Sequence, residues 1–136
     1  MHHGHAAAMA CGVTAVIAVH AGQLDRAIAD VRTAHPLAVT TQDMPVVATT
    51  GVAVAWVAAA MGKPEAAAKA IGAAARLRGS DDSGDPIVAR LTIRLRDELG
   101  NDFDRCHREG KKLDRADAIL AIDPDRILVV EPDRSS

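Results

Sequence analysis

Apolar residues recur every three or four positions along most of this 136-residue chain. Within 24–34, five of them fall on one stripe of a helix: Leu24, Ala27, Ile28, Val31 and Ala34. The charged residues between them, such as Asp25 and Arg26, fall on the opposite face. Apolar and polar residues segregated in this way are typical of an amphipathic α-helix with one side against a core.

Glycine and proline mark where such helices begin and end. The expected helices, six or seven in number, cover 6–21, 24–34, 44–61, 64–77, 85–99, 102–109 and 114–122. Gly22, Gly62, Gly100 and Gly110 each follow a periodic stretch and act as helix stops. Pro36 is expected to end the second helix at His35, because proline disfavours the helical conformation of the residue before it. Residues 37–41 would then be a short connection.

A sequence pattern occurs twice, forty residues apart, at 22–28 and 62–68. In each copy a glycine is followed three residues later by an acidic residue and five residues later by alanine. Small residues recur at matching places before and after the turn, and these are the expected helix-packing positions: Ala15, Ala27 and Ala34 in the first copy, and Ala55, Ala67 and Ala74 in the second. Repetition of this kind indicates a duplicated helix–turn–helix unit.

Composition supports an all-α fold. Hydrophobic residues make up 49% of the chain, but Trp56 and Phe103 are its only aromatic residues. Alanine, the best helix former, is far more common than the bulky residues that sheets prefer. We expect one domain of antiparallel helix pairs, stacked as a short tetratricopeptide-like superhelix over 6–122. Residues 1–5 are expected to be a disordered or tag-like N-terminus, and 123–136 a C-terminal tail that is either docked or frayed.

The charge pattern excludes several partners. The net charge is −2, with acidic and basic residues mixed along the chain. Nucleic acid would require a basic face, and an anionic membrane a polybasic stretch. The apolar run at 6–21 lacks a preceding positive charge and is too short to span a membrane. Together with two widely separated cysteines, Cys11 and Cys106, these features predict a soluble cytoplasmic protein with buried thiols.

Several stretches resemble a known family: 43–48, 61–67, 71–79 and 85–86. With the paired alanines, they resemble the C-terminal helical-repeat region of large bacterial transcriptional regulators, the AfsR-like and LuxR-type ATP-binding regulators. The resemblance covers roughly 24–122. It implies a tetratricopeptide-like interaction module and nothing more, because the DNA-binding and ATP-binding segments of that family have no counterpart here. Gly62-Lys63, for example, continues into Pro64 and does not form a phosphate-binding loop.

The resemblance also places a groove for a partner. In tetratricopeptide-like repeats the first helix of each pair lines the concave face. The corresponding positions here are Val16, Val19, His20, Val52, Trp56 and Ala59. Trp56 in such a groove would anchor a protein segment, or the groove would admit an apolar small molecule. The alternatives are that Trp56 fills a core of small residues, or that later helices cover it.

Self-association is the partner that we expect first. Two repeats are fewer than an isolated array normally needs, so one end would expose an apolar face. The uncovered end is the side formed by the first two helices, and the sequence therefore predicts a homodimer through that side.

No group of residues predicts catalysis, a metal or a cofactor. His2, His3 and His5 cluster at the terminus, where no fixed backbone would hold their rings on one metal. Cys106 and His107 are adjacent in sequence and so point to different faces of a helix. The alternation of Asp81, Ser83 and Asp85 lacks the glycine and glutamate of a calcium loop. We therefore expect a non-enzymatic protein.

Overall fold

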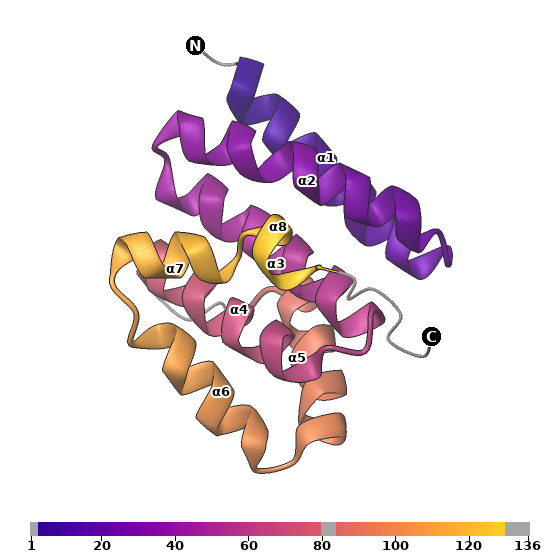
Figure 1. Ribbon diagram of the computed structural model, residues 1–136, viewed down its shortest axis with the longest axis vertical. Helices are drawn as coiled ribbons and strands as arrows, with labels where there is room; N and C mark the ends of the chain where they lie inside the picture. The colour runs from indigo at the N-terminus through magenta and orange to yellow at the C-terminus, as the bar shows by residue number, and fades with distance from the viewer. Residues whose placement is uncertain (1–2, 80–83, 130–136) are drawn as a thin grey trace, which may run out of the picture.

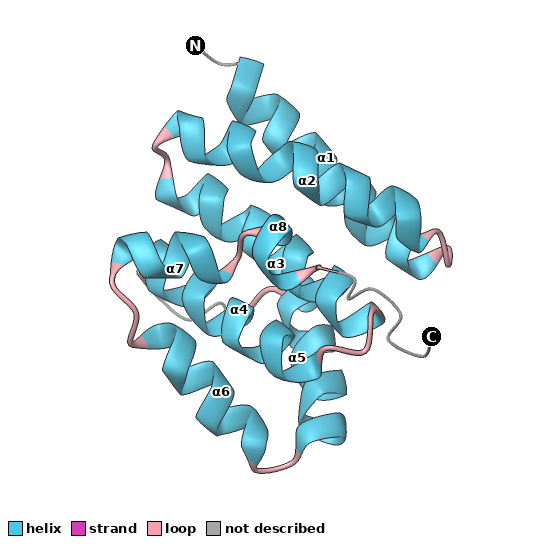
Figure 2. Ribbon diagram, viewed as in Figure 1, coloured by secondary structure: helices cyan, strands magenta, loops and turns pink. Residues whose placement is uncertain are grey.

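The computed structural model describes residues 3–79 and 84–129. In this part of the chain it contains helices and no strands (Figures 1 and 2). Eight helices follow one another in the described ranges: α1 His3–His20, α2 Leu24–Thr41, α3 Met44–Ala60, α4 Pro64–Arg78, α5 Pro86–Leu99, α6 Asp102–Lys111, α7 Arg115–Ala121 and α8 Pro124–Ile127. The all-α prediction is confirmed. The helices pack as antiparallel pairs, of which α1/α2 and α3/α4 are the most extensive.

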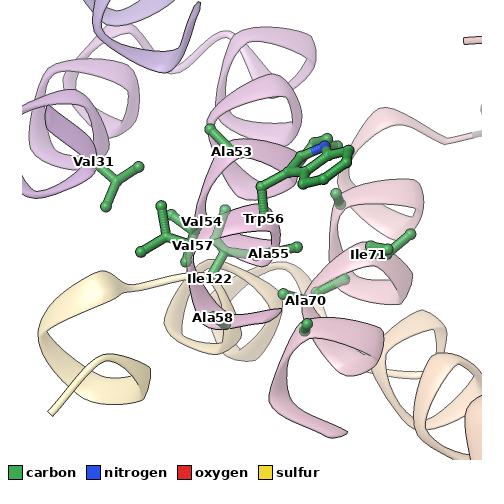
Figure 3. Packing of buried hydrophobic residues seen from close by; sticks show 14 of the residues in the cluster. Val31, Ala53, Val54, Ala55, Trp56, Val57, Ala58, Ala70, Ile71 and Ile122 are labelled. Atoms are coloured by element: carbon green, nitrogen blue, oxygen red, sulfur yellow. The ribbon is translucent and has the colours of Figure 1, made fainter. Parts of the chain in front are cut away.

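Helix α3 is the centre of the fold. It contains no charged residue, and every residue from Val46 to Ala59 except Thr49 is buried. A helix that is apolar on all sides must be surrounded, and α3 packs against α1, α2, α4 and α5. Figure 3 shows side chains leaving α3 in several directions, with Val54 and Trp56 on opposite sides.

The duplicated pattern forms two turns with the same geometry. Gly22 and Gly62 both have left-handed backbones, with φ of 74° and 78°. In the first turn the Gly22 N–H donates to the Val19 carbonyl at 3.1 Å, and in the second the Gly62 N–H donates to the Ala59 carbonyl at 3.1 Å. Glycine adopts this conformation without steric cost, which explains why it closes both helices.

The predicted end of the second helix is wrong. Helix α2 continues through Pro36 to Thr41. Pro36 cannot donate a backbone hydrogen bond, but it lies on the exposed side, where water can solvate the carbonyl it leaves unpaired. On the opposite side Ala38 is fully buried. Burial of the continuing apolar stripe outweighs the loss at Pro36, so 37–41 lengthens the helix instead of forming a connection.

Helices α4 and α6 cross with their backbones in contact. At Gly72 on α4, a Cβ atom would overlap the carbonyl oxygen of His107 on α6. At Gly110 on α6, a Cβ atom would overlap the carbonyl oxygen of Lys69 on α4. Gly110 was expected to stop the preceding helix, but α6 extends to Lys111. The role of Gly110 is close packing and not helix termination.

Both ends of the described chain take part in the fold, and the C-terminal segment follows the docked alternative. Residues 3–5, expected outside the domain, form the first turn of α1. The segment after 122 is docked up to Val129: Leu128 is fully buried, and Lys63 Nζ donates to the carbonyl oxygens of Ile127 and Val129 at 3.0 and 2.8 Å. The rest of the predicted tail, 130–136, lies outside the described residues. Packing therefore continues past the predicted domain end.

Candidate functional site

The six predicted groove residues lie on α1 and α3, and two of them, Val16 and Val52, line a small hollow described below. Val52, Trp56 and Ala59 on α3 are buried, whereas Val16 and Val19 on α1 are half-buried against the same core. The sixth residue, His20, is exposed at the end of α1. The facing sides of α1 and α3 are thus used for packing against each other.

Trp56 fills space between helices. Its side chain is 5% exposed, and its ring contacts the His20 imidazole with centroids 4.9 Å apart. The indole Nε1 is buried without a hydrogen-bond partner in the described part of the chain. Helix α5 reaches the same region, where Arg94 Nη2 donates to the Ala59 carbonyl oxygen at 3.2 Å. Of the alternatives for Trp56, its position fits a core residue, and little of it is accessible to a partner.

The predicted repeat-packing alanines are all buried. Ala15, Ala27, Ala55 and Ala67 are fully inaccessible and belong to one continuous core cluster with Ala74. The remaining member, Ala34, is also fully buried. Alanine at these positions lets the paired helices approach closely, and each position in the first pair has an equivalent in the second.

The outward face of α1 is apolar, which the sequence analysis did not single out. No Asp, Glu, Lys or Arg occurs between His3 and His20. Four residues at spacings of four, three and four face solvent, and we call them the α1 seam: Ala6, Ala10, Val13 and Ile17. Val13 is 55% and Ile17 62% exposed. A helix at the edge of a fold normally presents a polar face to water. The lack of charge in the first 24 residues was the sequence signal for this surface.

A small hollow adjoins the α1 seam. It has a volume of about 160 Å³ and lies between α1, α3 and the start of α5. Val13 and Ile17 line it from α1, and Ile87, which is 45% exposed, lines it from α5. Thr49, Arg78 and Asp85 also line this hollow, so the seam and the hollow together form one mainly apolar surface that includes two charged residues.

A larger hollow of about 470 Å³ lies between α3, α4, α5 and α6. Its walls are mainly apolar, and its polar lining comes from Arg78, Thr92, Arg96 and His107. Phe103 is the aromatic residue in its lining and is 2% exposed. Val52 also lines this hollow and was predicted as a groove residue, but the polar residues and Phe103 were not predicted to lie together, because they come from separate helices and follow no motif.

Two of the polar groups are held by Phe103. The Arg96 guanidinium carbon lies 4.5 Å from the Phe103 ring centroid, and the His107 ring stacks on Phe103 with centroids 5.4 Å apart. Arg96 Nη2 also pairs with Asp104 Oδ1 at 3.2 Å. Stacking and pairing of this kind reduce the freedom of the long Arg96 side chain.

Metal-ligand and thiol chemistry receive little support from the geometry. Over residues 3–79 and 84–129, no three His, Cys, Asp or Glu side chains converge to hold a metal ion. Burial raises the pKa of the Cys106 thiol above its ordinary value, and burial with the nearby Asp30 carboxylate does the same for Cys11. Both therefore stay protonated, a state that is poorly nucleophilic. Of the other candidate ligands, His2, Asp81 and Ser83 lie outside the described residues.

Comparison with known proteins identifies no relative: no protein-family model, curated protein or solved structure matches the chain. Across the described residues, no helix is long and apolar enough to cross a membrane. The surfaces above are therefore interpreted from their own chemistry.

Proposed function

We propose that this protein is a non-catalytic interaction module of two tetratricopeptide-like helix pairs, which assembles as a homodimer through the α1 seam. The observation that carries the proposal is the uncharged, solvent-facing stripe on α1. The resemblance of 24–122 to the repeat region of bacterial transcriptional regulators supports a role in setting the oligomeric state of such a regulator.

The repeat assignment is supported by the equivalence of α1/α2 and α3/α4. The two turns share glycine position, left-handed backbone and hydrogen bonds, and the alanines on either side are buried at equivalent places. In the second pair, α5, α6 and α7 cover the face of α4 that points away from the first pair. Among the described helices, α1 packs mainly against α2 and α3, and its outer face is exposed, which is the behaviour of an uncapped repeat end.

The position of apolar residues favours α1 over α2 as the proposed interface. The outward side of α2 carries polar and charged groups, including Arg26, Arg32 and Thr40. Ile28 on α2 is only half-buried but packs against the core. The outward side of α1 carries alanine, valine and isoleucine. Transfer of these side chains from water to an interface contributes roughly 25 cal/mol per Å².

A second copy of the chain is the occupant that the seam fits best. The α1 seam is uncharged and can meet its own copy without like-charge repulsion, as the self-complementary interface of a two-fold dimer requires. The adjoining hollow adds one residue of each sign, Arg78 and Asp85. The seam is also symmetric about its midpoint. In an antiparallel α1–α1 pair, Ala6 would face Ile17 of the partner subunit, and Ala10 would face Val13 of the partner subunit. Each small side chain thus meets a larger one, which favours close packing.

One helix alone provides too little surface. Stable interfaces bury about 800 Å² on each partner, and the α1 seam exposes only four side chains. We therefore include the adjoining 160 Å³ hollow and Ile87 in the interface. A side chain of the partner that entered this hollow would anchor the dimer.

The test is the mass in solution of three single variants. Ile17→Asp and Val13→Asp should weaken dimerisation at least about a hundredfold, since each brings two unpaired charges into a two-fold interface and about 1.4 kcal/mol corresponds to tenfold. Leu120→Asp is the matched control, because Leu120 is 40% exposed on α7, away from the seam. Circular dichroism should show that all three remain folded. A dimer unaffected by both α1 variants would reject this interface.

A further inference from the structure

We propose that the 470 Å³ hollow between α3, α4, α5 and α6 is a binding site for an apolar carboxylate, a function separate from self-association. The hollow shares Val52 and Arg78 with the smaller hollow beside the α1 seam but is otherwise lined by α4, α5 and α6. In Figure 1, α1 and α6 lie at opposite ends of the fold. The proposal rests on three properties of the lining: its size, its apolar walls and the charge of its polar groups.

Small side chains create the space. The side of α4 that faces the hollow presents Ala74 and Ala75, and α5 contributes Ala89. Larger residues at these places would fill the gap between α4 and α5. At about 30 Å³ for each water-sized group, the volume accommodates about fifteen non-hydrogen atoms. That is the size of a medium-chain fatty acid or a bicyclic aromatic acid.

The apolar walls suit a hydrocarbon body. Val52, Ile71 and Phe103 are buried and line the hollow from three helices. Ile93 is 69% exposed and also lines it. Ligand sites commonly combine such walls with a few polar groups that orient the ligand.

The polar groups select an anion. Arg78 and Arg96 line the hollow. Arg78 Nη2 already donates to the Thr49 hydroxyl at 3.2 Å, so Arg96 is the group that we assign to the ligand. A guanidinium has five N–H donors in a planar fork, so the bond from Arg96 to Asp104 leaves others for a ligand oxygen. The fork matches a carboxylate in shape and charge. The His107 ring is stacked on Phe103 and forms part of the same wall.

The binding test uses dodecanoate below its critical micelle concentration and its uncharged analogue dodecanol below its solubility limit. Isothermal titration calorimetry should show dodecanoate binding with one site per chain and dodecanol binding at least tenfold more weakly, because it lacks the charge-assisted hydrogen bonds. No heat from dodecanoate would overturn the proposal, and so would equal affinity for the two compounds.

Two arginines on α5 provide a matched pair of variants. Arg96 lines the hollow, whereas Arg94 pairs with Glu98 at 3.2 Å and is absent from the lining. Arg96→Gln should weaken dodecanoate binding roughly tenfold, and Arg94→Gln should leave it unchanged. Ala89→Phe should abolish it by filling the space. If Arg96→Gln binds as well as the unmodified protein, the carboxylate assignment is wrong.

Discussion

The backbone contact between α4 and α6 leads to a specific prediction about the free energy of unfolding. Gly72→Ala would place a Cβ atom into the His107 carbonyl oxygen and 3.1 Å from the Lys111 nitrogen. Gly110→Ala would place one into the Lys69 carbonyl oxygen and 2.7 Å from the Ala73 nitrogen. The obstructing atoms belong to backbone, so no side-chain rotation relieves the overlap, and α4 and α6 must separate.

The magnitude follows from two opposing effects. Replacing glycine by alanine inside a helix stabilises it by about 1 kcal/mol. Overpacking a close contact costs about 1–3 kcal/mol and occasionally more. Because backbone obstructs both positions, we expect the upper end of that range, and a net loss of about 2 kcal/mol or more for Gly72→Ala and for Gly110→Ala. The matched control is Gly12→Ala on α1, where the new Cβ would lie 3.9 Å from the Ala53 Cβ. That variant should gain up to about 1 kcal/mol.

Urea unfolding followed by circular dichroism, at one protein concentration, measures these differences. The reasoning requires the Gly12→Ala protein to be at least as stable as the unmodified protein and both crossing variants to be less stable. If Gly72→Ala and Gly110→Ala unfold at the same urea concentration as Gly12→Ala, the helices are not in backbone contact.

The remaining predictions concern buried polar groups. The Thr50 hydroxyl is buried without a hydrogen-bond partner in the described residues. Thr50→Val should therefore increase the free energy of unfolding by about 1 kcal/mol, which is measured as a higher melting temperature. Thr49→Val should not raise the melting temperature, because the Thr49 hydroxyl donates to the Pro45 carbonyl and accepts from Arg78. Equal changes of melting temperature in the two variants would count against this reasoning. Cys106 has a higher pKa in the folded protein than its ordinary value of 9.0. As pH rises past 9.0, the thiol therefore ionises in the unfolded chain before it ionises in the folded one, and the free energy of unfolding should decline. Cys106→Ala should remove part of the decline between pH 8 and pH 10 in urea titrations, and an unchanged slope would show that the thiol is not responsible.

Helix positions were largely predictable because local chemistry determines them. Gly22, Gly62 and Gly100 end helices as expected, each with a positive φ. Asp85 begins α5, with its carboxylate accepting from the Ile87 N–H at 2.8 Å. Pro36 shows the limit of that reasoning: its local preference for a helix end was outweighed by tertiary burial of the residues beyond it.

The surfaces were harder to predict because they depend on which helices meet. Trp56 has the register of a groove residue, but α1 and α5 pack around it, which sequence spacing alone does not reveal. The hollow beside Phe103 joins side chains from four helices. Gly110 resembles a helix stop in sequence, and only the approach of α4 explains its place inside α6. The sequence predicted an exposed apolar face on the side of the first two helices, but not that this face belongs to α1 alone.

The most direct test of the proposed function is the mass of the protein in solution, measured by light scattering after gel filtration over a dilution series. The account predicts a dimer for the unmodified chain and for Leu120→Asp, and a monomer for Ile17→Asp at concentrations where the unmodified dimer persists. A monomer of unmodified protein at every concentration, or a dimer that Ile17→Asp and Val13→Asp leave intact, would contradict assembly through α1.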